Sequence, residues 1–228
     1  MVFAARYEEP PAVWGVGRVV VRDHVHPWAV SADDIADETA SMAPRLAALG
    51  LRDGGLVLIV SLLSAAIHVA PFERAAGSLG ARYSSADATN FDAFRTVSLV
   101  RQLRPAVVLG VNARVCDGIA ELGRDLTTVF DGVGAVAAAD RDAASRLGSA
   151  GVPTARWQRL GPTSAVSTTG ASTLDYDADR WRVEDDAGEL VITNVAPRLT
   201  RCERFGTGVA GQVVEPGRLV LAERSALA

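Results

Sequence analysis

The stretch "LVLIVSLLSAAIHVAPF", residues 56–72, decides the fold class of this 228-residue chain. Its first five residues are all apolar and follow the turn "RDGG", which is typical of a strand buried on both faces of a parallel sheet. A second such run, "AVVLGV" at residues 106–111, follows a helical pattern over residues 91–103. Buried strands that alternate with helices predict an α/β fold, in which helices cover a parallel sheet.

The segments around these two runs continue the alternation. Ser31 has the features of a helix N-cap, because acidic residues follow it at once and apolar residues then recur at helical spacing as far as Gly50. The other expected elements are helices at residues 65–78, 118–123 and 136–148 and strands at residues 81–85 and 127–132. Together they predict an α/β domain over residues 30–150.

The pattern changes after Gly151 to strand-like runs that turns separate, namely "RWRVED", "GELVITNV", "GQVV" and "RLVLAE". These runs predict a smaller, antiparallel β portion over residues 151–228 that packs on the same domain. The acidic segment "DADRWRVEDDAGE", which contains Trp181, is typical of a solvated hairpin. Residues 1–29 are expected to be irregular, with "RVVV" at residues 18–21 as one short strand.

Composition and charge exclude several classes of function. The formal net charge of -4 argues against a nucleic-acid partner, since such proteins carry a basic patch. All 23 basic residues are Arg, so the chain supplies no lysine for a Schiff base or a phosphate loop. The first residues lack a signal-peptide pattern, and the longest apolar run is short for a membrane span. These features predict a cytoplasmic protein without a membrane partner.

The region from Val30 to about Ala120 resembles the adenylate-forming acyl- and aryl-CoA ligases, and most closely their phenylacetate-CoA ligase branch. The residues that carry the resemblance are "ALGLRDGGLVLIV", "PFERAAGSLGARYSSADATN" and "LVRQLRPAVVLGVN", in the family's order. Further on, "GELVITNV" resembles the family's Gly-Glu-Leu-Val strand, and "RFGTGV" lies where the family has Arg-Thr-Gly-Asp. The resemblance implies a truncated part of the ligase large domain with an acyl or aryl pocket.

The chain departs from the family at the elements that handle ATP. Where the resemblance implies a phosphate loop, the chain has "VVVRDHVHPWAV", which contains no glycine. Ser164 stands in place of the acid that serves magnesium, and Val209 in place of the acid that binds the ribose. We also expect the family's small C-terminal domain, with its catalytic lysine, to be absent. We therefore expect a degenerate site that uses no ATP cofactor.

The family's acyl pocket is lined in part by the segment that here is "VSLLSAAIH". Ser61 follows a strand, and ligands of open α/β sheets bind beyond the carboxyl ends of the strands. Ser64 and His68 are four residues apart, so one helical face presents both. We expect a cleft between these residues and the turn Gly206, Thr207 and Gly208 to hold a ligand with a carboxylate or carbonyl. The alternatives are serines that only cap the helix and a histidine on a solvated flank.

Other reactive side chains have plainer interpretations. The cysteines are expected to pack in the core rather than to act as nucleophiles, and two histidines without a third ligand predict no metal site. Three arginines either hold a carboxylate or a phosphate of coenzyme A, or cover a sheet edge. These residues are Cys116, Cys202, His24, His26, Arg101, Arg104 and Arg114.

The sequence leaves three functions open. The first is a non-adenylating ligase homologue that binds a small acyl or aryl carboxylate, or its thioester with coenzyme A or a carrier protein. The second is an ATP-independent enzyme for acyl transfer, cyclisation or hydrolysis. The third is a pseudo-subunit that docks on an intact ligase. A truncated ligase fold exposes apolar surface, so we expect a homodimer or a partner-bound chain.

Overall fold

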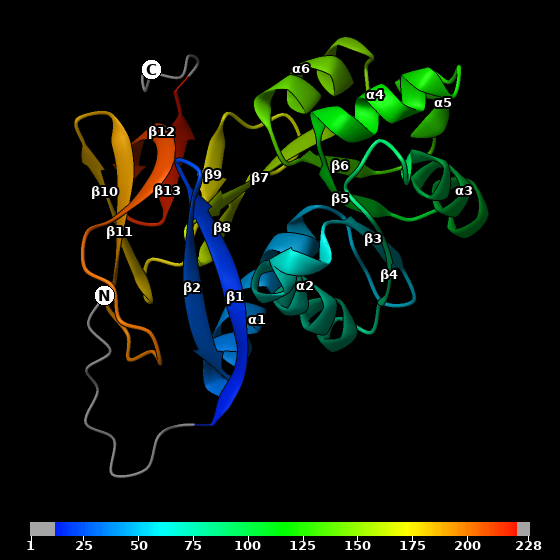
Figure 1. Cartoon of the computed structure of the whole chain (residues 1–228). Coiled ribbons are helices and arrows are strands. Elements are labelled where there is room, and N and C mark those ends of the chain that lie inside the picture. The colour runs from blue at the N-terminus through cyan, green and yellow to red at the C-terminus, as the bar shows by residue number, and fades with distance from the viewer. Residues whose placement is uncertain (1–11, 223–228) are drawn as a thin grey trace.

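The computed structural model describes residues 12–222, and five parallel strands form one end of its large sheet (Figure 1). Strand β3 pairs with β4 on one side and with β5 on the other, and β6 and β7 extend the sheet beyond β5 in the same direction. Their bounds are β3 Leu56–Val60, β4 Arg82–Ala86, β5 Val107–Val111, β6 Ala135–Ala138 and β7 Thr154–Leu160. The prediction that the two apolar runs are parallel strands of one sheet is confirmed.

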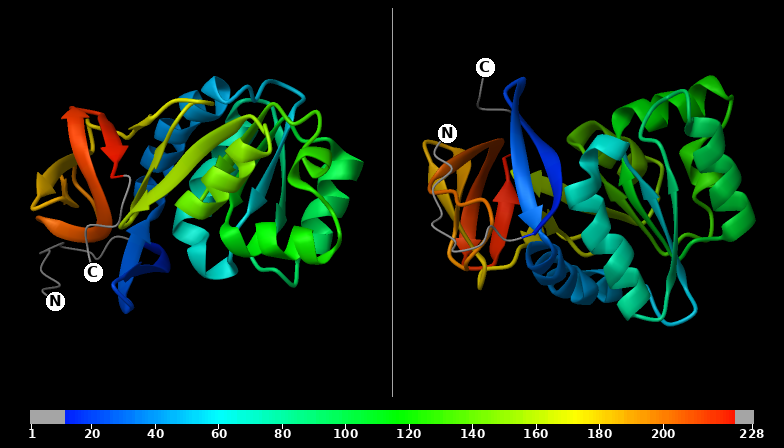
Figure 2. Two further views of the ribbon diagram at one scale, coloured as in Figure 1. Left: turned by 90° about the horizontal axis from the view of Figure 1, so that it is seen from above. Right: turned by 60° about the horizontal axis from the view of Figure 1, so that its bottom comes forward.

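Helices cover both faces of this parallel sheet (Figure 2). In β3, Val57 and Ile59 pack toward α1 and α2, whereas Leu58 and Val60 pack toward the helices of the other face. Successive side chains of a strand point to opposite faces, so a strand covered on both sides is apolar throughout. The helices are α1 Ala32–Ala48, α2 Ala66–Ser78, α3 Ala93–Leu103, α4 Ala113–Glu121, α5 Leu126–Val129 and α6 Arg141–Ser149.

Two expected elements after residue 120 are wrong. The strand expected at residues 127–132 overlaps helix α5, because the Asp125 side chain accepts a hydrogen bond from the backbone of Thr128 and starts a helical turn. The helix expected from residue 136 begins only after its N-cap, Asp140. The alanine-rich β6 before it is fully buried between two helical layers, and this burial overrides the helix propensity of alanine.

The N-terminal segment is a β-hairpin rather than an irregular stretch. Strands β1, Val13–Val21, and β2, His24–Ser31, pair antiparallel around a two-residue turn. Both turn residues, Arg22 and Asp23, have positive φ, as the tight turns that match strand twist require. The expectation of irregular structure over residues 1–29 is therefore wrong for residues 13–29, and residues 1–11 lie outside the described part. A Cβ at Gly17 would lie 2.5 Å from Ile67, so glycine lets the hairpin lie against α2.

The remaining strands extend the same sheet as an antiparallel portion, which confirms the predicted fold class. From β7 the order is β8, β9, β13, β12, β11 and β10. Their bounds are β8 Thr163–Val166, β9 Thr173–Asp175, β10 Trp181–Asp186, β11 Glu189–Asn194, β12 Phe205–Glu215 and β13 Arg218–Leu221. Strand β7 belongs to both portions, since its pairing with β6 is parallel and its pairing with β8 is antiparallel.

A buried carboxylate joins α1 to this antiparallel portion. Glu38 accepts hydrogen bonds from the indole of Trp181 at 2.8 Å, from the hydroxyl of Thr163 at 3.0 Å and from the guanidinium of Arg198 at 2.6 Å. The Arg198 guanidinium also lies over the Trp181 ring, 4.5 Å from its centroid. Trp181 is fully buried, so the expectation of a solvated hairpin at this residue is wrong.

Removing the Glu38 carboxylate leaves the buried guanidinium without its closest anion. We expect Glu38→Ala to lower the free energy of unfolding by about 3–5 kcal/mol, the usual cost of breaking a buried ion pair. Urea denaturation measures this loss. The control is Glu121→Ala at the exposed end of α4, which should change stability by less than about 0.5 kcal/mol. Equal losses in the two variants would contradict the role given to Glu38.

Candidate functional site

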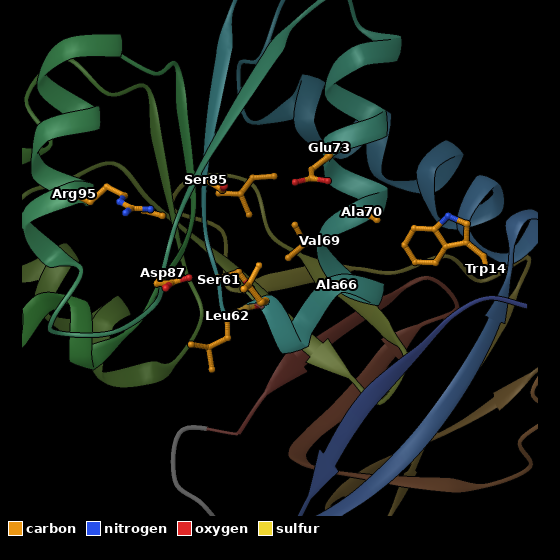
Figure 3. A pocket seen from close by; sticks show the side chains of 13 residues that line it. Trp14, Ser61, Leu62, Ala66, Val69, Ala70, Glu73, Ser85, Asp87 and Arg95 are labelled. Carbon is orange, nitrogen blue, oxygen red and sulfur yellow. The ribbon is translucent and has the colours of Figure 1, made fainter.

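A pocket of about 440 Å³ opens at the carboxyl ends of β3 and β4, between α2 and α3 (Figure 3). Ligands of open α/β sheets bind at this edge. Most of its wall is apolar, and the polar side chains in it are few. The apolar residues are Trp14, Ile59, Leu62, Leu63, Ala66, Val69, Ala70 and Ala86, and the polar ones are Ser61, Glu73, Ser85, Asp87 and Arg95.

Ser61 is held at the end of β3 by its backbone and its side chain. Its amide donates to the carbonyl of Ala86, which joins the ends of β3 and β4. Its hydroxyl accepts a hydrogen bond of 3.2 Å from the guanidinium of Arg159 in β7. Burial lowers the pKa of Arg159, and no ion pair among residues 12–222 includes this guanidinium. A positive charge with spare donors therefore lies directly behind Ser61.

Two carboxylates line the same pocket. Glu73 extends from α2 toward the ends of the strands, and burial raises the pKa of its side chain. Asp87 follows β4 directly. Within the described residues, neither carboxylate takes part in an ion pair. The guanidinium of Arg95, which also lines the pocket, lies 3.3 Å from the carboxylate of Asp92 instead. The pocket thus has two unpaired acids in its wall, and the guanidinium of Arg159 lies next to Ser61 at one end.

The structure separates the predicted pair Ser64 and His68. Ser64 is exposed in the short turn Leu63–Ala65 before α2, and it does not line the pocket. His68 points into the interior, where Met42, Pro162 and Ser164 surround it. Burial, and then the nearby charge of Arg159, lower the pKa of His68 from 6.5 to about 3. The histidine is thus a neutral core residue, neither solvated nor in the pocket.

The predicted glycine turn also lies apart from Ser61. Gly206, Thr207 and Gly208 are part of β12, not a turn between strands, and they border the β1–β2 hairpin. The Thr207 hydroxyl donates to the carbonyl of Leu190 at 2.6 Å, and the Gly208 amide donates to the Glu189 carboxylate at 2.7 Å. These bonds fix the strand and its irregular pairing with β11. The segment before Phe205 is irregular.

The residues that stand where the resembling ligases handle ATP are engaged within the fold, through packing or internal hydrogen bonds. The stretch 19–30 belongs to the hairpin β1–β2. Ser164 is buried in β8, and its hydroxyl accepts a 3.0 Å hydrogen bond from the indole of Trp157. Val209 packs against the core of the antiparallel portion.

The cysteines and histidines outside the pocket have structural surroundings. Cys116 is buried, which raises the pKa of its thiol to about 11, and burial also raises the pKa of Cys202. His26 packs edge-on against Phe205 at 5.3 Å, and His24 bonds to the backbone of Arg22. No group of three potential metal ligands occurs among residues 12–222.

The arginines singled out in the sequence do not form one site. Arg101 and Arg104 line an open hollow of about 750 Å³ together with Arg124, and Arg114 is not part of its lining. Pro105 and Val133 in this hollow precede β5 and β6, so the hollow lies at the opposite end of the sheet from Ser61.

No helix among the described residues is long and apolar enough to cross a membrane.

Several pocket residues were not predicted from the sequence. Asp87 follows a strand as Ser61 does, so the rule that selected Ser61 applies to it equally. Glu73 and Trp14 come from α2 and β1, and Arg159, which bonds to Ser61 without lining the pocket, comes from β7. Only their packing brings them together. No spacing in the sequence indicates that these residues lie close together.

Comparison with solved structures shows the fold of adenylate-forming ligases. An open form of 2-hydroxyisobutyryl-CoA ligase, in complex with 2-HIB-AMP and CoA, matches 92% of this chain with a TM-score of 0.69 at 16% identity. A benzoate CoA ligase from Burkholderia xenovorans LB400 matches 97% of it, with a TM-score of 0.66 at 13% identity. The N-terminal subdomain of NpsA from Klebsiella oxytoca, in complex with 3-hydroxybenzoyl-AMSN, matches 96%, with a TM-score of 0.62 at 11% identity.

The chain spans only part of these structures, namely 56% of the first, 50% of the second and 64% of the third. No protein-family model and no curated protein sequence matches it. At these identities the comparison establishes the fold alone.

The buried His68 makes stability depend on pH. Its pKa is lower in the folded chain, so the unfolded chain binds the extra proton, and stability is complete above pH 6.5 and falls as the pH drops toward 3. We expect a loss of about 1.5–2 kcal/mol between pH 6.5 and 5 from this group. Urea denaturation at both pH values measures it. His68→Gln should remove most of this dependence, whereas His24→Gln on the exposed hairpin should keep it; an unchanged slope in His68→Gln would refute the assignment.

Proposed function

We propose that the chain binds a small acyl or aryl group, as the carboxylate or as its thioester with coenzyme A or a carrier protein, and does not adenylate it. The observation that carries this proposal is the pocket at the carboxyl ends of β3 and β4, in which an apolar wall meets the Ser61 hydroxyl. Such a site fixes one polar end of a mostly apolar ligand. The sequence resemblance to the phenylacetate-CoA ligase branch supports an aryl or apolar acyl body.

We propose the absence of adenylation because of the residues that stand where the resembling ligases handle ATP. Phosphoryl and adenylyl transfer need a phosphate grip, a metal and stabilisation of developing charge. Here a hairpin, a hydroxyl bonded to Trp157 and a packed valine occupy the corresponding positions. We infer that nothing in residues 12–222 replaces those groups.

A second candidate function is ATP-independent catalysis in the same pocket. The pKa of Glu73 is raised by burial, and a carboxylate of this kind beside an apolar pocket can accept or donate a proton. Hydrolysis or cyclisation of a bound thioester would use such a group. Release of free thiol from phenylacetyl-CoA, lost in Glu73→Gln, distinguishes this function from binding alone.

Titration calorimetry with ATP and magnesium tests the absence of adenylation. We expect no saturable binding tighter than about 100 μM, which corresponds to about 5.5 kcal/mol. Pyrophosphate exchange in the presence of phenylacetate or benzoate should also be absent. Tight binding of ATP, or exchange above the background of a protein-free sample, would overturn the proposal.

Filling the pocket tests the site itself. Ala66 lines it from the exposed side of α2, so Ala66→Trp should occupy the space without disturbing the core. We expect this variant to lose at least 10-fold in affinity for phenylacetate, benzoate or their CoA thioesters, measured by calorimetry. Ala120→Trp, on the exposed side of α4, is the matched control and should bind as the parent does. Equal affinities for the two variants would place the ligand elsewhere.

We also propose that the hairpin β1–β2 is covered by a second copy or a partner. Val20 pairs directly with Val25, and together with Val16 they give the ribbon an exposed apolar face. Exposed apolar patches of this kind commonly mark interfaces. We expect light scattering to report a dimer that Val20→Asp converts to a monomer. A monomeric parent at all concentrations, without a co-purifying partner, would contradict this proposal.

A further inference from the structure

The charges around the pocket differ between its two ends, and this difference restricts the ligand. Ser61 and the guanidinium of Arg159 behind it lie at one end, while Glu73 stands on the wall that α2 provides (Figure 3). A carbonyl or carboxylate oxygen suits the first, because the guanidinium has spare donors and the Ser61 hydroxyl, which now donates to the Leu62 carbonyl over a long 3.4 Å, can turn its proton to a ligand. The carboxylate of Glu73, by contrast, repels an anionic group of a ligand.

Glu73 lacks a positive partner within the described chain. None of the ion pairs among residues 12–222 includes it, and its neighbour Arg74 lies over the ring of Trp14, 5.5 Å from the centroid. Desolvation raises the pKa of Glu73, as expected for a partly buried carboxylate without a counter-charge. A cationic group in the pocket would relieve that cost.

The other charged side chains of the wall do not reverse this preference. Asp87 adds a second carboxylate, and its own backbone amide donates to Asp92 at 2.8 Å. Asp92 also holds Arg95, at 3.3 Å, on the side of the pocket away from Glu73. The wall therefore carries two unpaired acids and one guanidinium that already has an anion.

We propose that the ligand of this pocket is amphoteric: a small apolar acyl group that carries a basic amine at the end remote from its carbonyl, such as an ω-amino acid or its thioester. Its ammonium group pairs with Glu73, and its carbonyl or carboxylate lies at Ser61 and Arg159. The apolar body lies between them against Leu62 and Val69. This inference rests on the proposed binding function and names the ligand class of the same pocket.

Matched probes separate the two charges. 4-(Aminomethyl)benzoate, 4-methylbenzoate and benzylamine share one apolar body, and 6-aminohexanoate and hexanoate form a second matched set. By calorimetry at pH 7.5, we expect each amino acid to bind the parent at least 10-fold tighter than its deaminated acid. Glu73→Gln should weaken amino-acid binding about 10-fold and leave the deaminated acids unchanged or tighter. Glu121→Gln on exposed α4 is the matched control and should change nothing.

The outcomes distinguish this inference from the binding function beneath it. If the deaminated acids bind tighter than the amino acids, and Ala66→Trp abolishes their binding, the pocket binds acyl groups but the amphoteric ligand is wrong. If amino acids bind but Glu73→Gln binds them as the parent does, the pairing with Glu73 is wrong. If none of the probes binds the parent, both the binding function and the inference are overturned.

Discussion

The buried carboxylate of Glu38 is the interaction on which the arrangement of the molecule depends. A single side chain from α1 accepts hydrogen bonds from Trp181, Thr163 and Arg198, which come from three separate parts of the antiparallel portion. Charge burial is costly unless every partner is in place, so the network favours one arrangement of helix and strands over near alternatives. The core around Leu160 and Leu190 packs against both α1 and the hairpin.

That fixed arrangement determines where the pocket lies and what faces it. Strand β7 continues from the parallel sheet into the antiparallel portion, and it carries Arg159 to a position behind Ser61. Helix α2 presents His68 to the interior and Glu73 to the pocket, since these residues are five apart and so lie on different sides of the helix. A rotation of the same helix would exchange the two side chains. The electrostatics of the pocket thus follow from the packing of α2 against α1.

The parts of the fold that could be predicted from sequence are those in which burial leaves a uniform local pattern. Strands β3 and β5 are apolar throughout because helices cover both faces, and Ser31 marks the start of α1 through a capping box with Asp34. The sequence predicts a helix from residue 136 because alanine favours a helix locally, whereas burial between two helical layers makes these residues strand β6, and the helix starts only after its N-cap, Asp140. In the site, Ser61 follows from strand polarity alone. Glu73 and Arg159 do not, because the side of a helix and the end of a distant strand are fixed only by tertiary packing.

The contact between the hairpin and α2 has an optical consequence. Of the four tryptophans, Trp28, Trp157 and Trp181 are buried, and Trp14 alone is substantially exposed, at 39%. Trp14 is also a wall residue of the pocket, with the Arg74 guanidinium over its ring. An aqueous quencher such as iodide or acrylamide therefore reaches this indole selectively. The natural fluorescence of the chain carries a label-free signal from the mouth of the pocket, separate from the emission of its core.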